Sequence, residues 1–271
     1  MRSESYLELK KPGQFHWDPD EKKIDEAAFE NLDAIIHLAG APISKRWTKS
    51  YKKEVYDSRV ESADLLFEFA KKLNSPVKKF ITASGTNYYG TQTTDKIFTE
   101  NDKHANDFLG KLCFDLENSA QKFEEIGASV SMVRTAAVLS KKGGMLKELM
   151  PIAKWNLLSA LGSGKQILPW IHIDDLTDIY IQILENENLN GAYNASAPEF
   201  ITQKEFVQKL TKAMDKKVIF PNVPSFMLKL ILGEMSTILL KGSAISSEKI
   251  QKTGFDFKFK NSDAALKDLI T

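Results

Sequence analysis

The stretch FITASGTNYYG, from Phe80 to Gly90, holds the pattern that decides the fold of this chain. Its first half, FITAS, is apolar or small and predicts a buried β-strand. Its second half begins and ends with glycine, and it predicts a turn that exposes a hydroxyl group and two tyrosines. Ligands of parallel sheets lie beyond the carboxyl ends of the strands. The stretch therefore predicts a core strand and, directly after it, a ligand site.

Strands and helices alternate on both sides of this stretch. Further apolar strands are predicted at DAIIHLAG (33–40) and SVSMVRTAAVL (129–139), and amphipathic helices over about 48–73 and 105–125. Asp174 is the expected N-cap of another helix. Because the strands are apolar almost throughout, both faces of the sheet must be covered. The fold class is therefore α/β, with a parallel sheet between two layers of helices.

The composition excludes several classes of function. The net charge is +1 and the charges are scattered, which argues against nucleic acid or a membrane as a partner. The single cysteine, Cys113, cannot form an internal disulfide, and the four histidines lack zinc-binding spacing, so no metal site is expected. The first residues lack the apolar core of a secretion signal. We expect a cytoplasmic protein whose partner is a small-molecule substrate, and a homodimer is compatible with these features.

The pattern changes after about residue 195, where short helices replace the regular alternation. We therefore expect two units. Residues 1–195 form the sheet-containing core, and residues 196–271 form a small α+β cap that contributes to the substrate site.

Three predicted strands end in candidate ligand sites: LAGAP, SGTNYYG and RTAAVLS. Small residues at such ends let a flat cofactor approach the backbone. The positions expected to contact it are Leu38, Ala39, Gly40, Ala41, Ala83, Thr135 and Val138. A simpler interpretation of Ala39 and Gly40 is that they only form a tight turn.

Several longer motifs carry a family resemblance. DAIIHLAGAPISKRWT, DSRVES, ITASGTNYYG, NDFLGKLCFDLE and GSGKQILPWIHIDDL occur in an order and spacing that resemble the atypical short-chain dehydrogenase/reductases called epimerase family proteins, a SulA-like branch of the NAD-dependent epimerase/dehydratase family. The resemblance covers essentially the whole chain. It implies a Rossmann-type doubly wound sheet that binds NADP(H) or NAD(H), and an oxidoreductase or epimerase that acts on an unidentified small molecule.

One departure concerns the phosphate-binding turn. Members of that family begin with a strand, a GxxGxxG turn and a helix, and the 271 residues contain no such motif. The start MRSESY resembles the residues after the second strand, where Arg2 and Ser3 would bind the cofactor. We therefore expect an N-terminally truncated Rossmann core with weak cofactor binding. GQFHWDP (13–19) would then be a strand without a neighbour, and DAIIHLAG would have an unpaired edge.

A second departure concerns catalysis. Active extended reductases and epimerases carry a Tyr and a Lys four residues apart, and the cation lowers the tyrosine pKa. The branch that this chain resembles is similar to it in lacking the pair. The matching positions here are Leu109 and Cys113, which cannot replace that pair. Ser84 matches the family's catalytic Ser, which orients the substrate oxygen in active relatives. Tyr88 is a candidate substitute acid, although a packing or ring-stacking role is the simpler interpretation.

The remaining polar residues each have a structural alternative. Arg59 matches a cofactor-contacting Asn of extended relatives, or it forms a surface salt bridge. Cys113 is expected to be a buried helix residue, Arg134 a core ion-pair partner, Lys111 a solvated charge and His172 a structural residue bonded to Asp174 or Asp175. Gln166 and Trp170 would line the substrate side. The rival functions are a catalytically silent nucleotide-binding or regulatory protein and a non-functional gene fragment.

Overall fold

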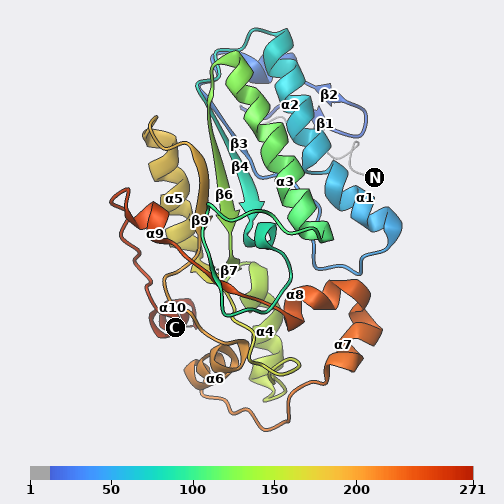
Figure 1. The fold of residues 1–271 in the computed structure, drawn as a ribbon, viewed down its shortest axis with the longest axis vertical. Coiled ribbons are helices and arrows are strands. Elements are labelled where there is room, and N and C mark those ends of the chain that lie inside the picture. The colour runs from blue at the N-terminus through green and yellow to red at the C-terminus, as the bar shows by residue number, and fades with distance from the viewer. Residues whose placement is uncertain (1–12, 271) are drawn as a thin grey trace.

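The computed structural model describes residues 13–270, and its centre is a four-stranded parallel sheet in the order β3-β4-β6-β9 (Figure 1). These strands are β3 (Ala34–His37), β4 (Lys79–Gly85), β6 (Ser129–Thr135) and β9 (Gly191–Ala195). Every neighbouring pair runs parallel, with Ile81 opposite both Ile36 and Ser131. The predicted α/β class with a parallel sheet is confirmed.

Helices cover both faces of this sheet (Figure 1). α2 (Val60–Lys72) and α3 (Phe108–Gln121) lie on one face, and α5 (Ile173–Glu185) lies on the other. Successive residues of β4 point to opposite faces. Phe80 packs in the cluster under α2 and α3, where its ring stacks on Phe123 at 3.8 Å, while Ile81 packs against Ile179 of α5. The two apolar layers predicted from the strand composition are both present.

Several predicted element boundaries are wrong. The helix expected over 48–73 is two helices, α1 (Lys49–Asp57) and α2, which meet at Arg59. The strand expected over 129–139 is divided into β6 and β7 (Ala137–Leu139). β7 leaves the main sheet because it pairs with β8 (Trp170–His172). α5 begins one residue before Asp174, since the His172 side chain, not Asp174, accepts from the first turn.

The expectation for GQFHWDP is also wrong. Within it, β1 (Trp17–Asp18) pairs antiparallel with β2 (Lys23–Ile24), so this segment forms a small hairpin outside the parallel sheet. The expectation for DAIIHLAG is confirmed within residues 13–270: β3 pairs only with β4, and Ile36 and Leu38 beside its open edge are 40% and 65% exposed.

The chain after β9 packs below the carboxyl end of the sheet (Figure 1). Its elements are α6 (Gln203–Ala213), α7 (Ser225–Leu232), α8 (Ser236–Leu240), β10 (Ala244–Ile245), α9 (Glu248–Gln251) and α10 (Ser262–Ile270). The segment shares a core with α4 (Gly144–Lys154), β7 and β8, where Trp170 meets Phe206 and Leu266. β10 also pairs with β5 (Ile97–Phe98). The predicted boundary at residue 195 therefore falls inside a shared core.

Short 3-10 helices complete the chain: η1 (Glu26–Phe29), η2 (Thr86–Tyr89), η3 (Lys122–Ile126) and η4 (Gly233–Met235). Within the described part of the chain, none of the helices has the length and apolar character needed to cross a membrane.

Candidate functional site

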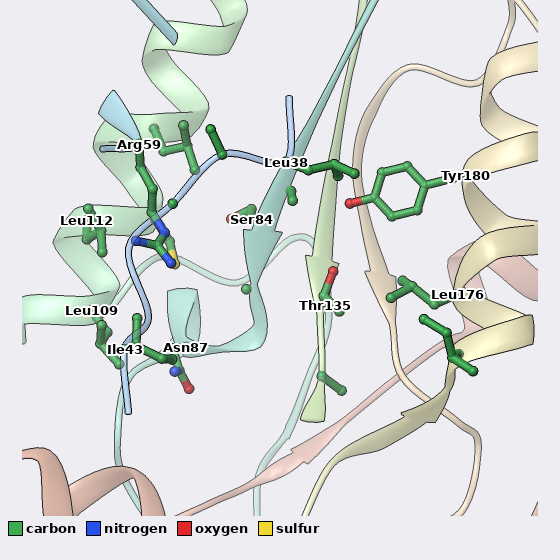
Figure 2. A pocket seen from close by; sticks show the side chains of 18 of the residues that line it. Leu38, Ile43, Arg59, Ser84, Asn87, Leu109, Leu112, Thr135, Leu176 and Tyr180 are labelled. Carbon is green, nitrogen blue, oxygen red and sulfur yellow. The ribbon is translucent and has the colours of Figure 1, made fainter. Parts of the chain in front are cut away.

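A cavity of about 460 Å³ lies at the carboxyl ends of β3, β4 and β6 (Figure 2). α3, together with Arg59 at the N-cap of α2, forms one wall, and α5 forms the opposite wall. Arg59 reaches in from one side and Tyr180 from the other, with Ser84 between them. The lining residues are mostly apolar, which is typical of a small-molecule site with a few polar anchors.

The structure brings most of the predicted site residues together. Those that line the cavity are Leu38, Ala39, Gly40, Arg59, Ala83, Ser84 and Thr135. Ala41 is buried in the cluster around Trp47, and Val138 packs in the cluster on the α5 side of the sheet. Tyr88 is also absent from the cavity wall. Arg2 and Ser3 lie outside the described residues.

Arg59 is a cation that faces the cavity. Its Nη1 donates to the carbonyl of Val55 at 3.1 Å, and no carboxylate among residues 13–270 forms an ion pair with it. Burial lowers the pKa of the guanidinium. A desolvated cation without a counter-charge favours an anionic ligand. The alternative of a surface salt bridge for Arg59 is wrong in this structure.

Gly40 permits this placement of Arg59. A Cβ atom at residue 40 would lie 2.6 Å from Arg59 Cζ, which is closer than atoms in proteins approach. The glycine therefore serves close approach of the guanidinium to the backbone. The simpler interpretation, that Gly40 only forms a turn, leaves this contact unexplained.

Ser84 belongs to a buried hydrogen-bond network. Its Oγ donates to Glu117 Oε1 at 2.7 Å. Arg134 donates two hydrogen bonds to the same carboxylate, from Nε to Oε1 at 2.9 Å and from Nη2 to Oε2 at 2.8 Å. Arg134 Nη1 donates to Tyr89 Oη, which donates to Asn194 Oδ1. The prediction that Arg134 is paired in the core is confirmed.

Tyr88 packs on this network. The Arg134 guanidinium carbon lies 3.4 Å from the centroid of the Tyr88 ring, and burial raises the pKa of its phenol. The ring also meets Tyr89 and His104 edge to face. These contacts agree with a packing and ring-stacking role for Tyr88, and a catalytic role for its hydroxyl stays a prediction.

The positions that match the Tyr–Lys pair do line the cavity. Leu109 is 2% exposed, and Cys113 is buried beside it. Burial, reinforced by the charge of Glu117, raises the pKa of the Cys113 thiol to about 11, so the thiol is protonated near neutral pH. This is the environment of an inert buried cysteine, as predicted. Lys111, between them, is exposed.

The three residues around β8 have structural roles. His172 Nδ1 accepts from the Asp174 backbone N–H at 3.1 Å, and its ring stacks on Phe259 at 3.8 Å. Gln166 Nε2 donates to the carbonyls of Leu161 and Leu239. Trp170 is fully buried. The structural role of His172 is confirmed, whereas neither Gln166 nor Trp170 lines the cavity.

The sequence analysis missed the α5 wall. Ile173, Leu176, Thr177 and Tyr180 recur at helical spacing on one face of α5, and all line the cavity. Burial raises the pKa of Tyr180, whose hydroxyl hydrogen-bonds to Thr135. Asn87 was also missed, although it lies in the quoted turn. Helical periodicity was the signal for the α5 stripe, but it could not show that the stripe faces a ligand.

Residues 13–270 contain no group of three or more His, Cys, Asp or Glu side chains that could hold a metal ion. The polar side chains of the cavity are one cation, the hydroxyls of one serine and of Thr177, one amide and the Thr135–Tyr180 pair. A cation and hydroxyls between apolar walls can bind an aromatic ring joined to an anionic group.

Comparison with known proteins identifies relatives of this chain. An epimerase family protein of Staphylococcus aureus strain MRSA252 is 36% identical over 271 residues, with 98% of this chain and 85% of that protein covered. The chloroplastic SDR39U1 homolog of Arabidopsis thaliana is 33% identical over 241 residues, which cover 88% of this chain and 68% of that protein. The crystal structure of human epimerase family protein SDR39U1 (isoform 2) with NADPH superposes with a TM-score of 0.82 at 29% identity, covering 96% of this chain and 88% of that one.

Two family profiles divide the sequence between them. Residues 223–269 match a domain of unknown function, DUF1731. Residues 16–196, which include β3, β4, β6 and the whole cavity wall, match the NAD dependent epimerase/dehydratase family. The chain belongs to the NAD dependent epimerase/dehydratase family, in its branch of epimerase family proteins.

Proposed function

We propose that this chain binds the nicotinamide half of NADP(H) in the cavity and acts as an oxidoreductase or epimerase on a small molecule. The observation that carries the proposal is the pairing of Arg59 with Ser84 in one apolar cavity at the strand ends. An SDR39U1 protein with 29% identity and the same fold has been crystallised with NADPH, which supports the choice of cofactor.

The residues present fit this half of the cofactor. The backbone of Leu38–Gly40 borders the cavity without bulky side chains at residues 39 and 40, and Arg59 lies directly above Gly40. A phosphate next to Arg59 would supply the missing counter-charge. A nicotinamide ring would then lie between the apolar residues of α3 and α5, in a volume within the usual range for ligand cavities.

The chain's own residues would bind, orient and exclude water. Bound nicotinamide cofactors supply hydride transfer. Arg59 would hold the phosphate, and Leu109, Leu112 and Leu176 would keep water from the reacting ring. Leu109 cannot exchange a proton, and the protonated Cys113 supplies no fixed cation. Proton transfer would therefore need water or the substrate itself, because Tyr88, the candidate from the sequence, does not line the cavity.

The affinity should be modest. Neither the sequence nor the described residues beside the cavity hold a GxxGxxG turn that leads into a helix N-terminus, so backbone N–H groups of that kind do not cradle the diphosphate. Among the described residues that line the cavity, Arg59 is the only cation that could hold that charge. We expect binding weaker than low-micromolar for the 271-residue chain.

Titration with NADPH tests the proposal, because energy transfer from tryptophan to the reduced nicotinamide reports its binding. We expect saturable, weak binding that Arg59→Gln weakens further, whereas Lys111→Gln on exposed α3 surface has no effect. Absence of saturable binding up to millimolar NADPH would refute the proposed function. Low-micromolar affinity would show that the phosphate turn is dispensable and would contradict the expected weakness.

A second candidate function has one specific observation in its favour. Because Leu109 and Cys113 replace the proton-transfer pair, the chain would also suit a nucleotide-binding protein without turnover. Hydride transfer to a panel of carbonyl compounds and quinones separates the two candidates. Turnover that depends on Ser84 supports the enzyme, and NADPH binding without any turnover supports the silent binding protein.

A further inference from the structure

The polarity of the hydrogen bonds around Ser84 restricts what this residue can recognise. Ser84 Oγ lies 2.7 Å from Glu117 Oε1, and the pair is almost completely buried. A serine hydroxyl has a single hydrogen and two acceptor lone pairs. The direction of this one bond therefore decides whether Ser84 offers the cavity a donor or an acceptor.

Arg134 settles that direction. Its Nε and Nη2 donate to both oxygens of Glu117, and the two side chains are only 4% and 6% exposed. Burial lowers the pKa of Arg134, but the hydrogen bond and charge of Glu117 outweigh it and raise that pKa. The guanidinium is therefore a permanent cation. Both carboxylate oxygens already face N–H donors, which leaves Glu117 without a proton to offer Ser84.

The other contacts of Arg134 keep its guanidinium in place, so that Glu117 stays oriented toward Ser84. Arg134 Nη1 donates a hydrogen bond to Tyr89 Oη, and the Tyr89 hydroxyl donates one to Asn194 Oδ1. The Tyr88 ring covers the face of the guanidinium at 3.4 Å. Each guanidinium nitrogen of Arg134 thus donates at least one hydrogen bond, and Glu117 Oε1 remains the acceptor for Ser84.

We propose that Glu117, held by Arg134, is a positioning residue that turns Ser84 into a hydrogen-bond acceptor toward the cavity, so that the site selects a ligand group that donates an N–H, such as a carboxamide, over one that offers only a carbonyl. Cys113 does not compete strongly for this acceptor, since thiols are weak donors. The inference differs from the family-based expectation that Ser84 orients a substrate oxygen.

The choice of ligand group rests on the proposed function, and a matched pair of cofactors tests it. NADP⁺ carries a carboxamide on its pyridine ring, and its 3-acetylpyridine analogue replaces only the NH₂ by CH₃. Both keep the carbonyl and the phosphates. One hydrogen bond supports a preference of about tenfold for NADP⁺ over the analogue in the dissociation constants measured by calorimetry.

Three variants separate the role of the network from general damage. Ser84→Ala should reduce the preference to about one. Glu117→Gln has one acceptor oxygen in place of two, so it holds the Ser84 hydrogen less firmly and the preference should fall toward one. Ser119→Ala, a buried serine of the same helix away from the cavity, should keep the tenfold preference. If Glu117→Gln does not fold, Ser84→Ala and Ser119→Ala still decide the result.

A neutron structure of the deuterated, ligand-free chain provides a readout that needs no ligand. The Ser84 deuteron should point at Glu117 Oε1. A deuteron directed into the cavity would overturn the inference, as would equal affinities of the wild type for the two cofactors. Failure of the wild type to bind either cofactor would refute the proposed function and the carboxamide as the selected group, and the deuteron position would still decide whether Ser84 is an acceptor.

Discussion

Replacing Arg134 by methionine should destabilise the fold more than any surface change, because it leaves the buried carboxylate of Glu117 without a counter-charge. Arg134 and Glu117 are 4% and 6% exposed. The substitution keeps most of the side-chain volume beneath the Tyr88 ring but removes four hydrogen bonds, two to Glu117, one to Tyr89 and one to the Glu100 carbonyl. The dominant loss is therefore electrostatic and not a cavity.

The expected size follows from the behaviour of buried ion pairs. Removing one partner of such a pair costs about 3–5 kcal/mol, whereas replacing both by apolar side chains is often nearly neutral. Arg134→Met should therefore lower the free energy of unfolding by about 4 kcal/mol. The double variant Arg134→Met/Glu117→Leu should recover most of that loss, with about 1 kcal/mol remaining because Ser84 loses its acceptor.

Urea unfolding followed by far-ultraviolet circular dichroism measures both variants. The midpoint should fall at an unchanged slope, since the surface exposed on unfolding stays the same. Two results would refute the reasoning: a loss below about 1 kcal/mol for Arg134→Met, or a double variant as unstable as the single one. The first would mean that water reaches Glu117, and the second that the site depends on packing around Arg134.

Three further predictions concern the cavity and its surroundings. Arg59→Gln should weaken NADPH binding by roughly tenfold in a fluorescence titration, because one charge-assisted contact is lost. Lys111→Gln should leave the affinity unchanged. Equal affinities of the two variants would place the phosphate elsewhere. Tyr88→Phe should keep NADPH affinity and any turnover, because its ring packs on Arg134 and its side chain does not line the cavity; a fall in rate of about 10²-fold or more with unchanged affinity would show instead that its hydroxyl is the acid. Burial, with a smaller contribution from Arg59, lowers the pKa of His37 from 6.5 to about 4. The unfolded chain then binds the extra proton first, so stability is complete above about pH 6.5 and falls by up to about 3 kcal/mol as the pH drops through 4. His37→Gln should flatten this part of a plot of unfolding free energy against pH, and an unaltered slope would contradict the assignment.

The order of strands and helices could be predicted from the sequence because it depends on short-range patterns. FITAS and SVSMV carry apolar or small residues on both faces, and only a sheet covered on both sides buries both. The ligand site at the strand ends followed from the same fact, since turns after parallel strands meet at one edge. Ser84, Gly40 and Thr135 were found in this way and do share a cavity.

Element boundaries and the roles of polar residues were not determined locally. β7 separates from β6 because it pairs with β8, about thirty residues later in the chain, and no pattern within 129–139 indicates that partner. The α5 wall resembles any amphipathic helix until its stripe is placed against the open end of the sheet.

The family resemblance pointed to Ser84, and the same resemblance gave Leu109 and Cys113 as the positions that match the proton-transfer pair. The direction of the Ser84 hydrogen bond was decided only by the tertiary structure. Glu117 comes from α3 and Arg134 from β6, and each is an ordinary charged residue in its own segment. Their electrostatic effect arises when folding removes water from both and places them within 3 Å of each other. Sequence patterns report which surfaces are buried, whereas the strength and direction of a buried polar contact depend on distances between groups that only the folded chain brings together.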